Sequence, residues 1–217
     1  MYLEDACNEL KNNKHFKLIL HIILSLGNVL NSNSNIRGQA DGFSLDLLPK
    51  LNGIKTNNGN NILNYICIKI KNYDENCEKI KKEFPKLIQA SEYSILESNK
   101  SLSELRKLSH KINENLGKLN NEEQFYIKCE EYNKKFKEYI NELEKKSDNN
   151  TNIYQETVKF FGYNEKDDFY TQNDKFFKML LNFFDDIDKA MPKPEAKKKF
   201  NNVKGVGKKI INNKQTN

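Results

Sequence analysis

Tryptophan is absent from this 217-residue chain, and only 4 prolines and 9 glycines interrupt it. So few forced breaks favour long helices. The core of such helices must be built from the 13 phenylalanines, the 10 tyrosines and the aliphatic residues. Charged residues make up 30% and apolar residues 37%, which is polar for a globule but ordinary for long helices exposed on several sides.

The chain also lacks any run of eighteen apolar residues. Its most apolar stretch, residues 16–30, is interrupted by Lys17, His21, Ser25 and Asn28. This stretch therefore predicts a buried helix and not a membrane span. The N-terminus is acidic first and amphipathic after, which is not the pattern of a signal peptide. We expect no transmembrane segment and a cytoplasmic protein.

No pattern typical of an enzyme or of a metal site is found. The cysteines at 7, 67, 77 and 129 form no CxxC pair, and no histidine stands near them at metal-ligand spacing. Cys67 and Cys129 fall on apolar faces and predict small core residues, and His21 predicts a core histidine with satisfied hydrogen bonds. The GVGK stretch at 205–208 lacks the rest of a phosphate-binding loop. We expect no enzyme, no catalytic residue, no metal and no cofactor.

Positive charge gathers at the C-terminal end. The formal net charge is +6, while the segment after Met191 alone carries eight lysines against one glutamate, so residues 1–191 are nearly neutral. Pro192 and Pro194 end the folded part, and too few apolar residues follow for folding. Residues 193–217 therefore predict a disordered basic tail. Such a tail could contact nucleic acid or a membrane surface without sequence preference, so no specific nucleic-acid partner is expected.

Helical spacing of apolar residues dominates the rest. It predicts helices over 2–31, 44–51, 62–73, 86–116, from 122 onward, and 173–190. Ser147 to Asn152 predicts a loosened stretch, after which residues 156–163 resume the helix. Apolar steps of three and four in 86–116 and 122–146 indicate an antiparallel coiled-coil hairpin. Its predicted seam comprises Ile88, Ile95, Leu102, Leu105, Ile112, Leu116, Leu119, Phe125, Cys129, Tyr132, Phe136, Tyr139 and Leu143.

No strand pattern is present, so the fold class is all-α: an elongated helical bundle with a long antiparallel coiled-coil hairpin and a globular subdomain. The stretch from 27 to 66 stands apart from the helices. It reads GNVLN (27–31), RGQADGF (37–43), LDLLPKL (45–51), then Lys55 and NNILNYI (60–66). In this combination it resembles the signature of the formin homology two domain, the actin-assembly domain of formins, and most of all the Cappuccino type. ETVKFFG (156–162) resembles a second, weaker family feature, and the resemblance covers about residues 10–190.

The resemblance implies a domain organisation. Residues 1–80 would hold the post-region helices and the signature, 81–146 the coiled-coil hairpin, 147–192 the helices that pack back on the post, and 193–217 the tail. The family order is lasso, linker, knob, coiled coil and post. On this resemblance the chain begins just before the post signature and lacks lasso, linker and most of the knob. We therefore expect that alone it neither nucleates actin nor forms the family's ring dimer.

The resemblance also implies a function. In the family, the post accepts the lasso of a second subunit, and the resulting ring encircles the barbed end of an actin filament. The chain would be the actin-binding part of such a domain, which promotes nucleation and processive barbed-end elongation when complete. Its partners would be actin, a second formin subunit and, indirectly, profilin-actin, and it would lie at the cytoskeleton.

Site residues follow from the matched motifs. The resemblance assigns actin binding to Lys55, with Lys50 as a weaker companion. It assigns lasso reception and dimer contact to Gly27, Asn28, Asn31, Arg37, Gly38, Gly42 and Phe43.

Plainer interpretations of these residues stay open. Gly27 could serve close helix packing, Asn28 and Asn31 could cap the helix, and Arg37 could clamp loop carbonyls. Lys55 could be a solvated loop lysine. The SNSNI stretch at 32–36 replaces a more glycine-rich loop, so the details of a lasso pocket are open too.

Two functions from other classes also fit the residues. One is a structural coiled-coil adaptor without actin activity, which would bind partner helices along the hairpin. The other is a nucleic-acid or membrane binder that acts through the basic tail, whose binding would be strongly salt-dependent.

Overall fold

The structure is a computed structural model that describes residues 2–33, 39–55, 59, 61–118 and 124–192. Arg37, Gly38, Leu119 and the tail 193–217, for which the sequence makes predictions, lie outside these residues. Within the described part, regular structure is helical apart from one isolated bridge between Lys55 and Asn61, so the predicted all-α fold is confirmed. None of the described helices combines the length and the apolar character that crossing a bilayer requires.

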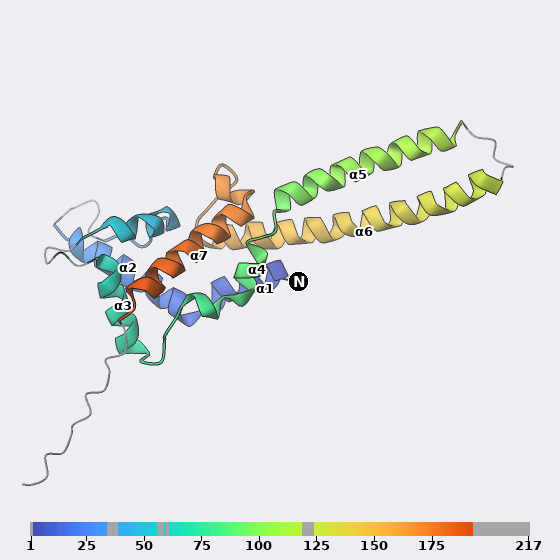
Figure 1. The fold of residues 1–217 in the computed structure, drawn as a ribbon. Coiled ribbons are helices and arrows are strands. Elements are labelled where there is room, and N and C mark those ends of the chain that lie inside the picture. Colours follow the sequence, from blue (N-terminus) through green and yellow to red (C-terminus); the bar gives the residue numbers. More distant parts are fainter. Residues whose placement is uncertain (1, 34–38, 56–58, 60, 119–123, 193–217) are drawn as a thin grey trace, which may run out of the picture.

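A compact end and a long two-helix arm make up the molecule (Figure 1). In the arm, α5 and α6 run antiparallel and pack against each other. In the compact end, α7 contacts α3, α4 and the three 3-10 segments. The elements are α1 (Tyr2–Asn12), α2 (Lys14–Leu30), η1 (Leu45–Gly53), α3 (Ile62–Tyr73), η2 (Lys81–Glu83), α4 (Pro85–Ala90), α5 (Ile95–Leu116), α6 (Gln124–Phe160), η3 (Asp168–Tyr170) and α7 (Asn173–Ala190).

The first predicted helix, 2–31, is in fact two helices that meet at Asn13. Asn13 leaves the helical conformation, and its side chain accepts a hydrogen bond from the backbone N–H of Phe16 at 2.8 Å. Asparagine is among the preferred residues at such a position because its oxygen satisfies an N–H that the first turn leaves free. A local capping signal therefore divides an apolar pattern that is otherwise continuous.

The predicted helix 86–116 is also divided, into α4 and α5. The break lies where the side chain of Asn173 reaches the backbone: its Oδ1 accepts from the N–H of Ile95 at 2.9 Å, and its Nδ2 donates to the carbonyl of Tyr93 at 2.7 Å. Asn173 is completely buried at the start of α7. A buried backbone group without a partner is costly, so this distant amide stabilises the break.

In α6 the difference is the reverse: a break is predicted at residues 147–152, and the helix runs through them without interruption. The sequence predicts a loosened stretch here because asparagine and serine favour turns. In the structure, Ser147 is buried and its hydroxyl lies 2.5 Å from Oδ1 of Asn99 on α5, while Thr151 donates to the carbonyl of Ser147. Tertiary packing on both sides of the tract overrides its weak helix propensity.

The core of the compact end is built from aromatic rings, as the composition predicts. Phe84 and Phe184 stack with ring centroids 4.5 Å apart, and Phe16 meets the edge of Phe184 at 5.3 Å. Such pairs add specific geometry to the burial of a large apolar area. Cys67 is buried in this core as predicted, whereas Cys129 on the arm is only partly buried.

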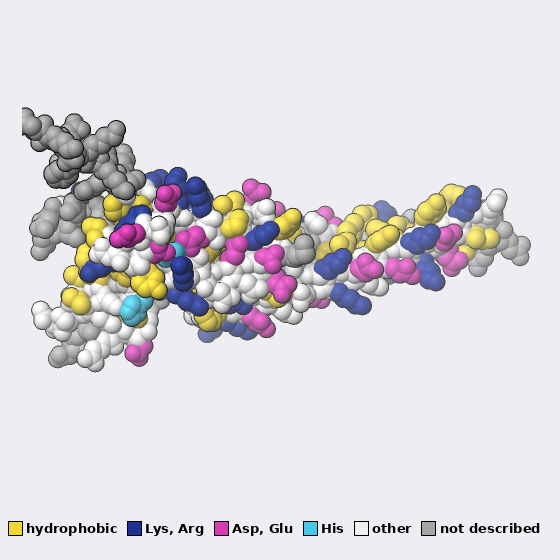
Figure 2. Space-filling view, turned by 90° about the horizontal axis from the view of Figure 1, so that it is seen from below, with side chains coloured by type: hydrophobic (Ala, Val, Ile, Leu, Met, Phe, Trp, Pro, Cys, Tyr) yellow, Lys and Arg dark blue, Asp and Glu magenta, His cyan; other side chains and the backbone are white. Residues whose placement is uncertain are grey.

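The seam of the arm differs from the predicted one. Tyr132, Tyr139 and Phe125 are 71%, 66% and 64% exposed, so they do not face α5. The buried positions of the arm are Ile95, Ser109, Leu116, Asn133, Ile140 and Ser147. Part of the seam on α6 is therefore displaced by about one residue, while the predicted Cys129 and Phe136 are partly buried and stay on it. Apolar side chains are left along the outside of the arm (Figure 2).

Polar contacts replace part of the expected apolar seam. Asn133 donates to Oδ1 of Asn113 at 2.6 Å, and Arg106 donates to Glu144 at 2.8 Å. The bond to Asn113 satisfies the amide nitrogen of Asn133, which favours this rotation of α6, while Oδ1 of Asn133 is buried without a partner among the described residues.

Candidate functional site

The glycine-rich signature begins at the C-terminal end of α2. There the side chain of Asn28 holds Ala40 by two hydrogen bonds, since Nδ2 donates to the carbonyl at 3.0 Å and Oδ1 accepts from the N–H at 2.9 Å. Asn31 caps the helix through its backbone N–H, which donates to the carbonyl of Gly27 at 3.0 Å. Asn28 therefore holds the backbone of Ala40 against the end of α2, and Asn31 caps this helix.

The next segment, η1, is positioned by both a local and a distant contact. Ser44 caps it through its hydroxyl, and Leu45, Leu48 and Leu51 are buried beneath it. Tyr163, which lies just beyond α6, donates to Oδ1 of Asp46 at 3.0 Å. This bond connects the signature to the second family-like segment, ETVKFFG.

The ETVKFFG segment ends α6 with a defined turn. Gly162 has a φ of +90°, the left-handed region that favours glycine. Its N–H donates to the carbonyl of Lys159, and the N–H of Tyr163 donates to that of Val158. These two bonds are the Schellman pattern of a helix C-terminus. Phe160, the last residue of α6, and Phe161 directly precede this turn.

Between these segments lies a largely apolar pocket of about 560 Å³. Its walls come from α1, from the middle of α2, from the GF pair of the signature, and from the FFG triplet of the second segment. Two motifs that are far apart in the sequence thus meet at one cavity. The lining residues are Leu10, Lys11, Phe16, Lys17, Leu20, His21, Leu24, Gly42, Phe43, Leu45, Phe160, Phe161 and Gly162.

Of the residues predicted for lasso reception, Gly42 and Phe43 line this pocket, and Gly27 and Asn28 do not. A Cβ atom at Gly27 would meet no neighbouring atom within 4 Å. Close helix packing, the plainer interpretation of Gly27, is therefore wrong for the chain by itself. A partner that covers this end of α2 would find space there. The part that these residues play in a dimer stays a prediction.

His21 was expected in the core, but it is exposed on the pocket wall. The core contacts of α2 are made by Phe16, Ile19 and Ile23, one helical face away. Sequence reasoning also missed Leu20 and Leu24 as pocket residues. Their i, i+4 spacing on a second apolar face of a helix that is not buried all round is the signal that could have found them.

The charge of the pocket lining is positive. Lys11 and Lys17 belong to it, and no carboxylate does so among the described residues. Phe160 stands at the wall with 63% of its surface exposed. The pocket can therefore take an apolar or aromatic side chain, and it offers cations to acidic groups beside that side chain.

Lys55 and Lys50 lie outside the pocket, and both are exposed. Lys55 forms an isolated bridge with Asn61, and beside it the N–H of Ile62 donates to the carbonyl of Ile54 at 3.0 Å. In the described part of the chain, no carboxylate lies within ion-pair distance of either lysine. Their contact with actin stays a prediction.

Comparison with known proteins agrees with this arrangement. A model of the Formin Homology 2 Domain matches residues 1–188. Formin-2 of Mus musculus is 38% identical over 112 residues, which are 48% of this chain and 7% of that protein. Formin of Gallus gallus is 33% identical over 170 residues, 72% of this chain and 14% of that protein. Protein cappuccino of Drosophila melanogaster is 39% identical over 61 residues, 28% of this chain and 6% of that protein.

The chain thus spans less than a fifth of the length of these relatives. The family match, in contrast, extends over nearly all of the described residues, from α1 to α7, and includes both motifs that form the pocket. The chain belongs to the formin homology 2 domain family.

Proposed function

We propose that this chain is the actin-binding post and arm of a formin homology 2 domain, which assembles actin filaments when the domain is complete. It would stabilise a filament nucleus and stay at the growing barbed end. In this proposal, residues 1–94 and 147–192 form the post and residues 95–146 the arm, and the protein works at the cytoskeleton. Such a domain accelerates assembly by holding subunits in filament geometry, without bond chemistry.

The observation that carries the proposal is the pocket between the two motifs. Its walls are largely apolar, and it lies between Gly42 and Phe43 on one side and Phe160 and Phe161 on the other. An inserted aromatic side chain from a second subunit would bury apolar area at about 25 cal/mol per Å². The pocket is therefore suited to receive the lasso that the family uses to close its ring.

Two exposed lysines support the actin contact. Lys50 lies on η1, and Lys55 lies a few residues later, where it is held by a backbone bridge to Asn61. An exposed cation on a fixed segment can meet an acidic surface without ordering a loop first. Profilin-bound actin would reach this chain indirectly, through other parts of a formin.

The test replaces Phe160 by serine in a complete domain that carries this chain. Phe160 is 63% exposed, so its loss should leave the fold intact. We expect weaker dimerisation in analytical ultracentrifugation and slower nucleation in pyrene-actin assembly. The matched control is Tyr139→Ser, at a position that is 66% exposed on the arm. If both variants dimerise and nucleate like the wild type, the pocket does not receive the lasso.

One observation favours a second function, that of a coiled-coil adaptor without actin activity. The outside of the arm exposes Tyr132, Tyr139 and Leu108, an apolar surface that a partner helix could cover. The two functions separate in a filament co-sedimentation experiment with a salt titration. An adaptor of this kind would itself stay in the supernatant while the filaments pellet, at every salt concentration.

A further inference from the structure

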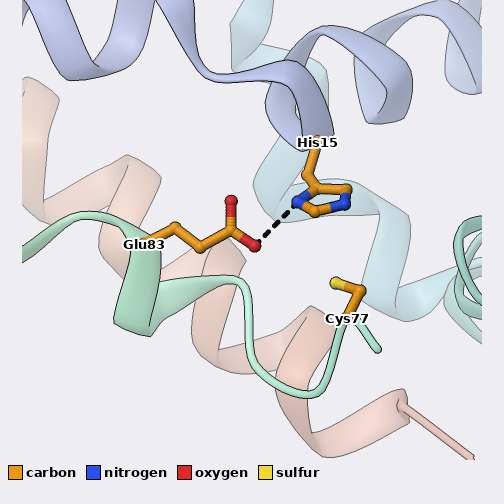
Figure 3. Close-up of side chains that lie close together, drawn as sticks. All are labelled: His15, Cys77 and Glu83. Atoms are coloured by element: carbon orange, nitrogen blue, oxygen red, sulfur yellow. Dashed lines mark hydrogen bonds and ion pairs between the residues drawn. The ribbon is translucent and has the colours of Figure 1, made fainter. Parts of the chain in front are cut away.

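Four side chains that do not line the pocket lie together in the compact end, His15 and three from the segment 74–83. His15 comes from the first turn of α2, Cys77 from the connection after α3, and Glu83 from η2 (Figure 3). One ligand atom of each lies within 4.8 Å of the other two. Asp74, at the C-terminal end of α3, contacts His15 from a further direction. Neither the post–lasso contact nor the actin contact uses these residues.

The donor set has the chemistry of a zinc site. Imidazole nitrogen, cysteine sulfur and carboxylate oxygen are the protein ligands that Zn²⁺ takes, usually four in a tetrahedron. The sequence could not show this set, because His15 and Glu83 are 68 residues apart and no CxxC or short His–Cys spacing announces it. Only the approach of three segments brings the donors together.

The histidine ring is held from both sides. Nδ1 of His15 lies 2.7 Å from Oε1 of Glu83, and Nε2 lies 3.2 Å from Oδ2 of Asp74. Oδ1 of Asp74 accepts from the N–H of Asn76 at 3.0 Å, so this carboxylate is itself fixed. A carboxylate that takes the N–H of one ring nitrogen leaves the other nitrogen free to bind metal, which is the usual arrangement around zinc histidines.

The glutamate is oriented in the same way. Oε2 of Glu83 accepts from the side-chain amide of Asn13 at 2.7 Å, and Asn13 is at the same time the cap of α2. This bond occupies one carboxylate oxygen and leaves Oε1 directed at the ring of His15 (Figure 3). Two donors of the set are thus placed by outer contacts before any ion arrives.

The thiol supplies an independent observation. Cys77 is only 4% exposed, and within the described residues no hydrogen-bond partner of its sulfur is recorded, whereas the buried thiol of Cys67 donates to the carbonyl of Ile187. Its sulfur faces the gap between the imidazole and the carboxylate (Figure 3). A buried thiol with no hydrogen-bond partner beside two oriented donors is free to serve as a metal ligand.

We propose that His15, Cys77 and Glu83 form a zinc-binding site that fastens the segment 74–84 to the start of α2. Nδ1, Sγ and Oε1 are the ligand atoms, Asp74 is the outer carboxylate that orients the ring, and water completes the tetrahedron. Zinc bonds of about 2.0–2.3 Å place such donors roughly 3.3–3.7 Å from one another. The hydrogen bond between His15 and Glu83 must open slightly and the sulfur must approach, which are shifts of about an ångström.

Binding is coupled to the loss of a proton. Burial is the main cause that raises the pKa of the Cys77 thiol to about 11, with smaller contributions from the carboxylates of Glu83 and Asp74 and an opposing one from Lys71. Without metal the sulfur is therefore protonated at neutral pH. Binding of Zn²⁺ forms bonds to Sγ, Nδ1 and Oε1 and releases to water both the thiol proton and the proton of the hydrogen bond between Nδ1 and Oε1, so the affinity should fall as the pH is lowered.

The experiment uses the purified 217-residue chain after treatment with a chelator, with Zn²⁺ and Co²⁺ as probes. Equilibrium dialysis should give one Zn²⁺ per chain. The melting temperature should rise by about 5–10 °C when free Zn²⁺ exceeds the dissociation constant a hundredfold. Co²⁺ should produce a thiolate charge-transfer band in the near ultraviolet and the visible bands of a tetrahedral ion. A wild-type chain that shows neither the shift nor the band would overturn the proposal.

Variants show whether the ion is bound through Cys77 or through another cysteine. Cys77→Ser should lose the charge-transfer band and the melting shift, while Cys129→Ser, which removes a thiol on the arm, should keep both. Asp74→Asn should weaken binding by about 10–100-fold. If Cys77→Ser does not fold, as judged by its helical circular dichroism, Glu83→Gln is used in its place. The glutamine can still hydrogen-bond to His15, and this variant should also lose the charge-transfer band and the melting shift. Wild-type affinity in Cys77→Ser or in Glu83→Gln means that the ion is bound elsewhere.

Discussion

Tyr163 and Asp46 are joined across 117 residues of chain by a hydrogen bond of 3.0 Å, from the phenol to Oδ1. Asp46 also accepts from the hydroxyl of Ser44, which caps η1. Burial and the nearby carboxylate raise the pKa of Tyr163, so the phenol stays a donor at neutral pH. Through this pair, the turn that ends α6 is coupled to the signature loop, and both walls of the pocket keep their relative positions.

Removal of this phenol should loosen the pocket. Tyr163→Phe should lower the free energy of unfolding by about 1 kcal/mol, because one hydrogen bond is lost and the carboxylate keeps another donor. Thermal melts followed by circular dichroism measure the change. Tyr139→Phe, on the exposed outside of α6, is the control and should melt like the wild type. Equal stability of Tyr163→Phe and the control would show that the bond does not hold η1 in place.

The displaced seam of the arm can be tested with two neighbouring residues. Ile140 is 4% exposed and Tyr139 is 66% exposed. Ile140→Ala should cost about 2–4 kcal/mol of stability, since it leaves a cavity between α5 and α6. Tyr139→Ala should change stability by less than about 0.5 kcal/mol. Urea unfolding of both variants decides between the observed seam and the seam predicted from heptads, which gives the opposite order.

Two substitutions at Gly27 can distinguish an effect on stability from an effect on partner binding. Because a Cβ atom would meet open space, Gly27→Ala should stabilise the chain by about 0.5–1 kcal/mol through better helix propensity. Gly27→Leu should fold as well, yet in a complete domain it should weaken dimerisation by about 5–100-fold if a lasso covers this end of α2. Sedimentation of both variants measures the effect. A leucine variant that dimerises normally would place the lasso elsewhere.

Lys55 tests the actin contact. In a complete domain, Lys55→Asp should weaken barbed-end binding by about one to two decades, because it removes an attraction and adds a repulsion. Inhibition of barbed-end elongation from filament seeds measures this affinity. Lys100→Asp, at an exposed position on α5, is the control and should inhibit like the wild type. Matched melting curves must accompany the assay, since a lower melting temperature would indicate a structural role instead.

Alkaline pH should destabilise the core through Cys67. Burial raises the pKa of its thiol from the ordinary 9.0 to about 12, with smaller contributions from Asp188 and Cys77. In the unfolded chain the thiol loses its proton first, so between about pH 9 and 12 the unfolded state binds fewer protons. The contribution of Cys67 is therefore complete below pH 9 and is lost as the pH rises through this window, by at most about 1.4 kcal/mol per unit.

The measurement compares melting temperatures from pH 8 to 11 in two variants. Cys67→Ala should flatten the alkaline fall relative to the wild type, while Cys129→Ala, on the partly exposed arm, should not. Tyrosines and Cys77 titrate in the same range, so only the difference between the variants is informative. Parallel curves for wild type and Cys67→Ala would show that this thiol does not couple folding to pH.

The sequence by itself determined those structural elements that depend only on interactions between residues close together in the chain. The apolar spacing of 62–73 and 173–190 predicts α3 and α7 closely, because a face buried on one side repeats every turn. Gly162 ends α6 because only a glycine accepts its left-handed backbone without strain. Gly42 and Phe43, which the family motif singles out, both line the pocket because the signature is a contiguous stretch, while their part in a dimer stays a prediction.

Only the tertiary structure decided the features that depend on distant partners. Asn173 divides α4 from α5, the contact of Ser147 with Asn99 on α5 keeps the asparagine tract helical, and polar pairs such as Asn113 and Asn133 displace the seam. Local propensity favours one conformation of a segment by a few tenths of a kcal/mol per residue. One buried amide without a hydrogen bond, or one cavity, costs about a kcal/mol or more and therefore outweighs it. For the same reason no spacing in the sequence could bring His15 to Cys77 or Gly42 to Phe160: chain segments become neighbours only when the whole core packs.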